Sequence, residues 1–557
     1  MEKSNKVRFL LCTLAWGSLL SSPLLNSAHA ATLVYTNDVL GEIEPCGCRS
    51  NPQGGMLRKS HLLEKLRQTD SSLLQLDAGD LLFDNLKLPE ILQKQSEVQA
   101  GFLLKSMDLV HHDAVVPGEK DFALGVKTFE KLTAASKIQF LAANLKKKNG
   151  KAFLKSSALF TLTENEHPLK IAVIGLVGET LEWPRELKAS SPITVAKALV
   201  PALRKKADLV IALTHQGYEA DKALAKAVPG IDMIVGGHTQ SFLQTPEKVG
   251  NTLIYQSSFR NQYVGVQPLH SLRSKGSTVA TPAASDAASK TKAALEKQLL
   301  DEHRLVGLDP AYEPKEGTPD PMRDLVADSK REIAQVNSQT ELKMVRESTP
   351  PQTSDRQLQT FPRCAECHLK QFDFWRRTDH AQALQPLILA KQAQNLDCLS
   401  CHTVGLGQPS GFSHVNQLAE LQPLTPTAPG TPDSQKPRPY SMDDLGPFLK
   451  AMHEAKSLEA PVKLTRDSKS LPLKGSLNQI NRSFTPVQCE NCHTAGGEHP
   501  FSGTYTREVK AESCLKCHTP ERAPGWYLPS GKLDVEKVAQ KRLSITCPAG
   551  DLAPSDN

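Results

Sequence analysis

The last third of the chain carries four copies of the pentapeptide Cys-x-x-Cys-His. In this spacing, two thiols can form thioether bonds to the vinyl groups of a porphyrin, and the histidine that follows can ligate its iron. A zinc site built from Cys-x-x-Cys pairs needs no histidine after every second cysteine, and structural disulfides need no fixed gap. We therefore predict four covalent haem c groups, attached through Cys364, Cys367, His368, Cys398, Cys401, His402, Cys489, Cys492, His493, Cys514, Cys517 and His518.

Further histidines near these motifs are candidates for the second axial position on iron. They are His380, His414, His453 and His499. Four proximal and four further histidines are enough for four haems with two histidine ligands each. A haem without a second ligand would be open to a small molecule such as NO or nitrite. The sequence is compatible with both arrangements.

The first 30 residues have the organisation of an export signal. Lys3, Lys6 and Arg8 precede an apolar stretch over 9–25, and Ala28-His29-Ala30 is a small-residue cleavage site, so the mature chain is predicted to begin near Ala31. The stretch is short for a spanning helix, and no later stretch approaches the roughly 18 apolar residues that a span needs. We predict an exported bacterial protein of the periplasm, where such haems are attached, with periplasmic or membrane-bound redox partners. A net charge of +6 over 557 residues gives no reason to expect nucleic-acid binding.

Residues 31–270 alternate short apolar runs with helical patterns, which is typical of a layered α/β domain. Many of the runs lack polar alternation, as expected for strands that are covered on both faces. The candidate strands are 32–36, 73–76, 114–116, 140–142, 171–176, 209–213, 233–235 and 253–256. The candidate helices are 57–68, 91–107, 195–206 and 221–228.

The rest of the chain differs in composition. Residues 271–357 are predicted to be a partly helical linker, because 274–290 is rich in Ala, Ser, Thr and Lys while 292–304 and 322–336 have helical spacing. Residues 358–525 hold the haem motifs and include a Pro-rich insert over 405–439. Residues 526–557 are a weakly patterned tail.

Clusters of polar residues follow several of the candidate strands in the N-terminal half, at the positions where α/β sheets place their ligand sites. Carboxylate, imidazole and amide side chains in such clusters are typical ligands of a two-metal hydrolytic centre. The clusters are Asn37-Asp38, Asp77-Ala78-Gly79-Asp80, Gly118-Glu119-Lys120-Asp121, Thr214-His215-Gln216-Gly217 and Gly236-Gly237-His238-Thr239-Gln240.

The order of these clusters resembles the 5′-nucleotidase branch of the calcineurin-like metallophosphoesterases. The similarity runs through residues 31–270 and is especially close over 215–238. The resemblance implies one or two bound divalent metal ions. It places Asp38, Asp80, His215, His238 and Gln240 at positions where the family keeps metal ligands.

Three features depart from the family pattern. Its Asp-x-His reads Asp38-Val39-Leu40 here, so one histidine ligand is missing. Its Gly-Asn-His-Glu reads Gly118-Glu119-Lys120-Asp121, in which Glu119 can still bind a metal. Lys120 stands at the position of the catalytic histidine and is a poorer general acid at neutral pH unless its pKa is lowered. The family's separate nucleotide-binding domain is also missing, so both an altered metal site and a retained fold without activity stay open.

A Pro45-Cys46-Gly47-Cys48 sequence follows directly on the loop that carries Asp38. Such a pair can form a strained disulfide, bind a soft metal or act as redox thiols. A structural disulfide that involves Cys547 is the alternative. Because the sequence resembles a nucleotidase-like branch with reactive cysteine or selenocysteine, Cys46 and Cys48 join Lys120 as candidate catalytic residues.

The haem motifs and the residues between them resemble tetrahaem cytochromes of the nitrifier type. Beyond the motifs, the shared positions include Trp375, Asp379-His380-Ala381, Thr403-Val404-Gly405 and His499. The resemblance implies a small, mostly helical domain with closely stacked haems, in which His380 and His499 are distal ligands. We therefore expect an α+β multidomain protein, with a layered α/β metallophosphoesterase-like sandwich followed by a mostly helical, loop-rich multihaem cytochrome domain.

These patterns are compatible with three functions. The first is periplasmic electron transfer by the cytochrome domain, with the N-terminal domain binding a partner or a small substrate. The second is metal-dependent hydrolysis of a phosphate or sulfur ester, with an accessory cytochrome. The third is reduction of a nitrogen oxyanion at an open haem.

Overall fold

The computed structural model describes residues 31–45, 52–69, 72–164, 167–269, 302–339, 357–365, 368–408, 410–412, 414–415, 418–421, 449–450, 452–453, 480–497, 508–520, 522–528 and 532–548. The predicted export signal and most of the Pro-rich insert lie outside these ranges, as do Cys46, Cys48, Cys367 and His499. None of the helices in the described ranges is both long and apolar enough to cross a membrane.

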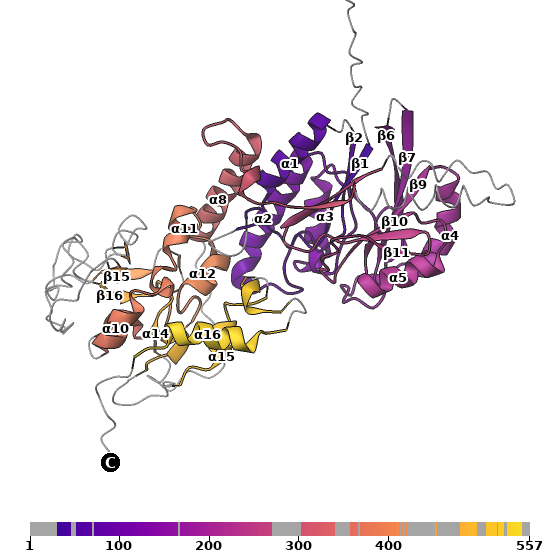
Figure 1. The fold of residues 1–557 in the computed structure, drawn as a ribbon. Coiled ribbons are helices and arrows are strands. Elements are labelled where there is room, and N and C mark those ends of the chain that lie inside the picture. The colour runs from indigo at the N-terminus through magenta and orange to yellow at the C-terminus, as the bar shows by residue number, and fades with distance from the viewer. Residues whose placement is uncertain are drawn as a thin grey trace, which may run out of the picture.

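Two six-stranded sheets form the N-terminal part of the chain (Figure 1). The first has the order β14-β13-β1-β2-β3-β4, and β1 to β4 run parallel. Its strands are β1 (Ala31–Thr36), β2 (Ser72–Asp77), β3 (Ala114–Val115), β4 (Gln139–Phe140), β13 (Tyr263–Pro268) and β14 (Arg304–Gly307).

The second sheet has the order β11-β12-β10-β9-β7-β6, with parallel pairing from β12 to β7. Its strands are β6 (Ser157–Glu164), β7 (His167–Val177), β9 (Leu209–His215), β10 (Met233–Gly237), β11 (Glu247–Val249) and β12 (Thr252–Tyr255). A separate pair consists of β5 (Leu145–Lys147) and β8 (Leu187–Ala189).

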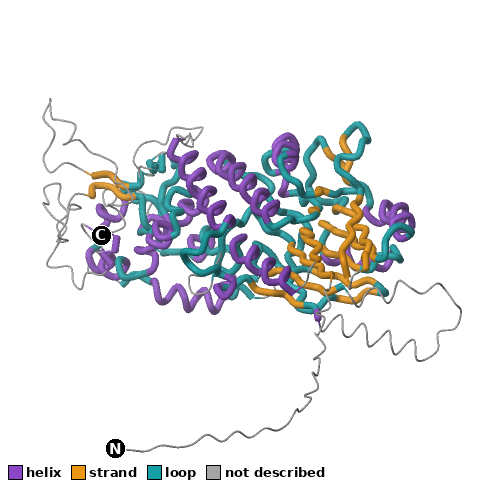
Figure 2. Tube along the Cα trace, turned by 90° about the horizontal axis from the view of Figure 1, so that it is seen from above, coloured by secondary structure: helices purple, strands orange, loops and turns teal. Residues whose placement is uncertain are grey.

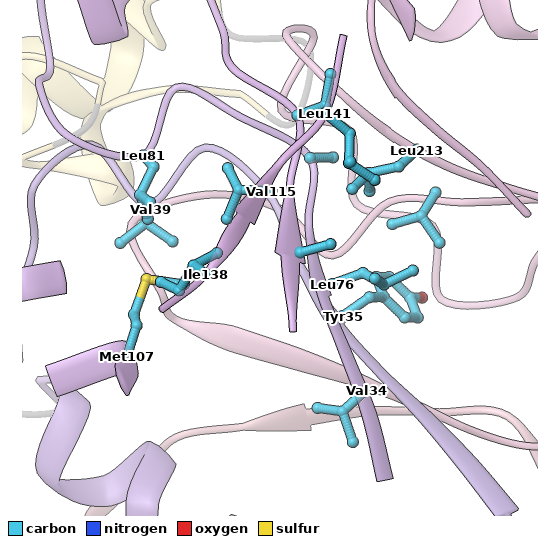
Figure 3. Close-up of a cluster of buried hydrophobic side chains, with 14 of the residues drawn as sticks. Val34, Tyr35, Val39, Leu76, Leu81, Met107, Val115, Ile138, Leu141 and Leu213 are labelled. Atoms are coloured by element: carbon cyan, nitrogen blue, oxygen red, sulfur yellow. The ribbon is translucent and has the colours of Figure 1, made fainter. Parts of the chain in front are cut away.

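The two sheets pack face to face around one apolar core. Tyr35 of β1 meets Tyr255 of β12 edge-on, with ring centroids 5.5 Å apart. Leu213 of β9 lies near Leu141, which follows β4, in the close-up of this cluster (Figure 3). Strands that are buried on both faces need apolar residues at every position, which explains why the candidate strands showed so little polar alternation.

Helices cover the outer faces of both sheets. On the first sheet, Met107 of α2 lies next to Ile138 and Val39 (Figure 3). On the second, Val200 of α4 and Leu224 of α5 belong to a separate buried cluster. The helices of this part are α1 (Met56–Thr69), α2 (Glu90–Leu109), η1 (Lys120–Phe122), α3 (Val126–Ala134), α4 (Pro192–Arg204), α5 (Tyr218–Ala227), η2 (Pro310–Tyr312) and α8 (Pro321–Gln339).

The segment 271–357 is predicted to be a linker, but its described part packs with the N-terminal layers. β14 pairs antiparallel with β13 at the edge of the first sheet. α8 lies against α1 and α2 (Figure 1), and its Met322 and Val326 are buried in the main core. Charged residues such as Asp324, Arg331 and Glu332 lie on the exposed side of this packed helix.

The C-terminal part consists of short helices around an apolar core of its own (Figure 2). Phe361, Phe372 and Trp375 form its aromatic centre, with ring centroids 5.2–6.0 Å apart. The predicted tail contains the helix α16, whose N-cap Asp534 accepts a hydrogen bond from the Lys537 N–H at 3.1 Å. The elements are α9 (Thr360–Ala365), α10 (Leu369–Trp375), η3 (Asp379–Gln382), α11 (Gln385–Leu389), α12 (Leu396–His402), β15 (Ala419–Leu421), β16 (Ile480–Ser483), α14 (Cys489–His493), α15 (Ala511–Leu515), η5 (Pro524–Trp526) and α16 (Val535–Ile545).

Candidate metal centre and haem-binding region

Loops at the carboxyl ends of neighbouring strands bring the predicted metal ligands together. Asp38 follows β1 and Asp80 follows β2, while Glu119 lies on the loop after β3. His215 is the last residue of β9, and His238 comes directly after β10. The backbone of Asp38, Asp80 and His238 has φ values of 51°, 49° and 77°. Such conformations are uncommon for residues other than glycine and cluster at functional sites.

Two groups of these side chains have the spacing of metal ligands. One is Glu119, His215 and His238, and the other is Asp38, Asp80 and His215, with ligand atoms within 4.8 Å of one another in each group. Glu119 Oε1 lies 3.0 Å from His238 Nδ1, and Glu119 Oε2 lies 3.1 Å from His215 Nε2. His215 Nε2 is also 3.5 Å from Asp80 Oδ1. His215 therefore stands where the two groups meet.

The chemistry of these donors fits a bound divalent cation. Several buried ligand atoms make no hydrogen bond of normal geometry, among them Asp38 Oδ1, Glu119 Oε2 and His215 Nε2. Leaving buried polar atoms unpaired is unfavourable, and carboxylate oxygens and imidazole nitrogens are common metal ligands. The Nδ1–H of His215 donates to Ala78 O at 2.6 Å. This bond fixes the ring so that Nε2 faces the carboxylates.

The pocket carries an excess of negative charge. Burial raises the pKa of Asp38 to about 6. Burial alone would lower the pKa of His215, but the carboxylates of Asp80 and Glu119 raise it to about 10. A cation bound here would therefore stabilise the ionised carboxylates and compete with the proton on His215.

Gly118 allows the loops to approach this closely. A Cβ at this position would lie 2.5 Å from Asp80 N and 2.7 Å from His215 Nε2. Asp121 holds the same loop, because its carboxylate accepts from Leu82 N–H at 2.7 Å and from Gly118 N–H at 2.8 Å. Burial raises the pKa of Asp121 to about 7. Asp121 belongs to one of the polar clusters found in the sequence, but its hydrogen bonds to Leu82 and Gly118 become apparent only in the structure.

Lys120 is held by Asp80. Its Nζ lies 2.9 Å from Asp80 Oδ2, and its backbone N–H donates to Asp80 Oδ1 at 3.0 Å. Burial would lower the pKa of Lys120, but the ion pair with Asp80 raises it above the ordinary value. Proton donation at neutral pH would need a lowered pKa, so this environment favours a role for Lys120 as a fixed positive charge.

Three other residues, Leu40, Gln240 and Asn37, lie close in sequence to these ligands. Leu40 stands where the family pattern has a histidine, is 5% exposed and offers no ligand atom. Gln240 is half-buried, two residues after His238. Asn37 was given no role from the sequence, yet its Nδ2 donates to Asp38 Oδ2 at 2.8 Å and its Oδ1 accepts from Ser257 N–H at 2.6 Å.

In the C-terminal region, two histidines are oriented by backbone carbonyls. The Nδ1–H of His402, in the second haem motif, donates to Ala383 O. The Nδ1–H of His453 donates to Arg376 O at 2.9 Å. In metal-binding histidines this kind of bond fixes the ring and leaves Nε2 for the metal. His453, one of the four further histidines considered as second axial ligands, therefore has its ring oriented in this way.

The rings of His380 and His518 form an edge-on contact, with an interplanar angle of 64° and centroids 6.1 Å apart. With metal–nitrogen bonds of about 2.0 Å, two imidazoles on opposite sides of one metal have centres roughly 6 Å apart. Trp526 stacks on His518 at 4.3 Å. The second and fourth motifs are neighbours, since Cys517 Sγ lies 3.9 Å from Cys401 O. None of the described cysteines is in a disulfide, so their thiols fit haem attachment.

The fold and these two regions define a class: a 5′-nucleotidase-like α/β sandwich joined to a cytochrome c region. Residues 363–423 match the family model described as "Cytochrome c554 and c-prime". The N-terminal region is 31% identical over 234 residues to human 5′-nucleotidase, covering 39% of each chain. It is 31% identical over 248 residues to mouse 5′-nucleotidase, covering 42% of each.

The chain thus spans about two-fifths of the length of these curated relatives. Among solved structures, the sulfate thiohydrolase SoxB of Thermus thermophilus matches with a TM-score of 0.43 at 19% identity, over 56% of this chain and 62% of that chain. The resemblance of the N-terminal region to 5′-nucleotidases and that of the C-terminal region to the cytochrome c554 family are confirmed, as is the fold class.

Proposed function

We propose that this chain is a periplasmic electron-transfer protein with four haem c groups, in which the cytochrome region exchanges electrons with a metal-binding N-terminal domain. The observation that carries the proposal is the arrangement of the histidines around the haem motifs. His402 and His453 have Nδ1 tied to carbonyl groups, and the rings of His380 and His518 lie at the spacing of two axial ligands. Haem bound there would supply one-electron chemistry, while the chain holds and orients the ligands.

Contacts between the N-terminal domain and the cytochrome region support the proposed exchange of electrons. The segment after Asp38 includes Glu44, whose carboxylate contacts Gln392 and forms an ion pair with Lys330. Gln392 lies shortly before α12, the helix that carries Cys398, Cys401 and His402. The predicted thiols Cys46 and Cys48 follow Glu44 almost directly in the sequence. The haem of the second motif is therefore the one we expect to serve the N-terminal site.

A buried glutamine strengthens the same contact. Gln95 of α2 is 1% exposed, donates to Asn395 Oδ1 at 2.6 Å and accepts from Leu396 N–H at 2.9 Å. It also accepts from Asn337 Nδ2 of α8 at 2.8 Å. Because both ends of the contact are buried and hydrogen-bonded, α12 is held in a fixed position on the N-terminal domain.

The test is a potentiometric titration of the full-length protein, followed by haem absorbance and spin state, with and without prior reduction and alkylation of its thiols. We expect low-spin signals from haems with two histidine ligands and a change in the titration curve on alkylation. The matched control is a variant with Cys46→Ser and Cys48→Ser, in which alkylation reaches only Cys547. A titration that is identical with and without alkylation would contradict the coupling. A high-spin haem signal that shifts with nitrite would favour reduction of a nitrogen oxyanion instead.

A second candidate function is metal-dependent hydrolysis of a phosphate or sulfur ester. It is favoured by the ligand-like grouping of Glu119, His215 and His238 next to Asp80. Turnover of a generic phosphate ester that is lost in Asp80→Ala and His215→Ala, but kept in Lys131→Ala, would support it. Activity that survives both substitutions would end it.

A further inference from the structure

The number of cations that the pocket can hold is limited by His215, which has one nitrogen donor available. Both ligand groups, Glu119/His215/His238 and Asp38/Asp80/His215, depend on this residue. Its Nδ1 is already engaged by Ala78 O at 2.6 Å, so only Nε2 is left as a donor. One nitrogen lone pair binds one ion. The two groups therefore cannot both be completed at the same time.

The group that lacks His215 is a poor site for an ion. It keeps the carboxylates of Asp38 and Asp80, but Lys120 already bonds both oxygens of Asp80, through Nζ at 2.9 Å and through its backbone N–H at 3.0 Å. Asp38 Oδ2 accepts from Asn37 Nδ2 at 2.8 Å and from His238 N–H at 3.1 Å. Next to this pair, Leu40 is buried and apolar.

The charges of the side chains in the pocket also indicate a single bound cation. Asp38, Asp80 and Glu119 contribute three negative charges when ionised, and Lys120, which interacts electrostatically with all three, contributes one positive charge. One divalent cation makes the set neutral, whereas two would leave a net charge of plus two. Asp38 and Asp80 are 0% exposed, and uncompensated charge in a buried site is strongly unfavourable.

We propose that the pocket binds a single divalent cation, held by Glu119, His215 and His238 with Asp80, and that the Lys120 ammonium takes the place of a second cation beside Asp38 and Asp80. Lys120 is then a positioning and charge-balancing residue. The number of bound cations does not depend on the direction of electron flow between the haems and the N-terminal domain.

The experiment counts manganese in the full-length, haem-loaded protein. Manganese is chosen because haem iron does not interfere with its measurement by mass spectrometry. After chelation, equilibration with excess Mn²⁺ and removal of loose ions, the native chain should retain one Mn²⁺. The double variant Lys120→Ala, Leu40→His should retain two, because it removes the tethered charge and adds a ligand. Lys131→Ala, which removes an exposed lysine paired with Glu97, is the control and should retain one.

A single substitution gives a second readout if the double variant does not fold, which loss of haem absorbance or circular dichroism would reveal. Lys120→Met removes a positive charge near the bound ion, so the dissociation constant for Mn²⁺ should fall by about tenfold. A purely structural role for Lys120 would give weaker binding in this variant. Two ions in the native chain, or weaker binding in Lys120→Met, would overturn the proposal.

Discussion

The metal pocket and the haem region assemble their ligands in opposite ways. Each predicted haem attachment motif is five consecutive residues, so its chemistry would be carried by a local sequence. The pocket draws Asp38, Asp80, Glu119, His215 and His238 from strand ends that are up to two hundred residues apart. Haem attachment is therefore expected to depend on local sequence, whereas the pocket depends on the packing of the whole sandwich. Substitutions in the two regions should therefore differ in what they change.

The largest effect is expected at the second haem motif. Replacing Cys398 and Cys401 by serine removes both thioether attachments of one haem. We expect haem content, measured by absorbance against protein mass, to fall from four groups to three. The metal pocket should stay intact, because it lies in the other part of the chain. Cys547→Ser is the control, and an unchanged haem content in the double variant would refute attachment at this motif.

The pocket should be sensitive to a single methyl group. Gly118→Ala places a Cβ 2.5 Å from Asp80 N and 2.7 Å from His215 Nε2. We expect a loss of about 2 kcal/mol in the free energy of unfolding together with loss of bound Mn²⁺, measured by thermal melting and metal counting. The matched control is Gly101→Ala in α2, where the nearest atom is Leu132 Cδ2 at 3.9 Å. A stable, metal-binding Gly118→Ala variant would show that the loops around Gly118 are less closely packed than these distances indicate.

The contact between the two regions should respond to the loss of one buried amide. Gln95→Ala leaves the N–H of Leu396 without its partner, and an unsatisfied buried donor costs about 1–3 kcal/mol. We expect a lower melting temperature and faster hydrogen exchange in α12. Gln93→Ala, on the exposed side of the same helix, removes only a 3.2 Å bond to Leu88 O and should have little effect. Equal behaviour of the two variants would argue against a fixed contact.

The smallest effect is expected for a surface ion pair distant from both sites. Lys131 Nζ lies 2.6 Å from Glu97 Oε1, and the lysine side chain is 73% exposed. Because solvent screens such pairs, Lys131→Ala should change the free energy of unfolding by less than about 0.5 kcal/mol. Melting experiments on this variant set the baseline for the others, and a large change would mean that the surface contributes more than this description allows.

Much of the sandwich could be predicted from the sequence, because strands buried on both faces are continuous apolar runs. The candidate strand 209–213 corresponds to β9, in which every residue is buried. The edge strand β6 was missed, since its residues alternate between buried and exposed and do not form the continuous apolar run of a strand covered on both faces. β14 and α16 were missed because their stability comes from partners elsewhere in the chain.

The candidate pocket, too, could be predicted from the sequence only in part. The polar clusters after the strands pointed to Asp38, Asp80, Glu119, His215 and His238, because carboxyl strand ends meet at one edge of a sheet. The sequence could not show that Lys120 bonds both oxygens of Asp80, nor that Arg376 O orients His453. Both contacts depend on long-range packing, which no local pattern reports.

The central claim requires a second redox group in the N-terminal domain that can exchange electrons with the haems, and a coulometric titration of the full-length protein tests for that group most directly. If Cys46 and Cys48 form a disulfide, its reduction to two thiols takes up two electrons and two protons. The fully oxidised native chain should then accept six electrons, four at the haems and two at the disulfide, and the Cys46→Ser, Cys48→Ser variant should accept four. Four electrons in both proteins would contradict the claim.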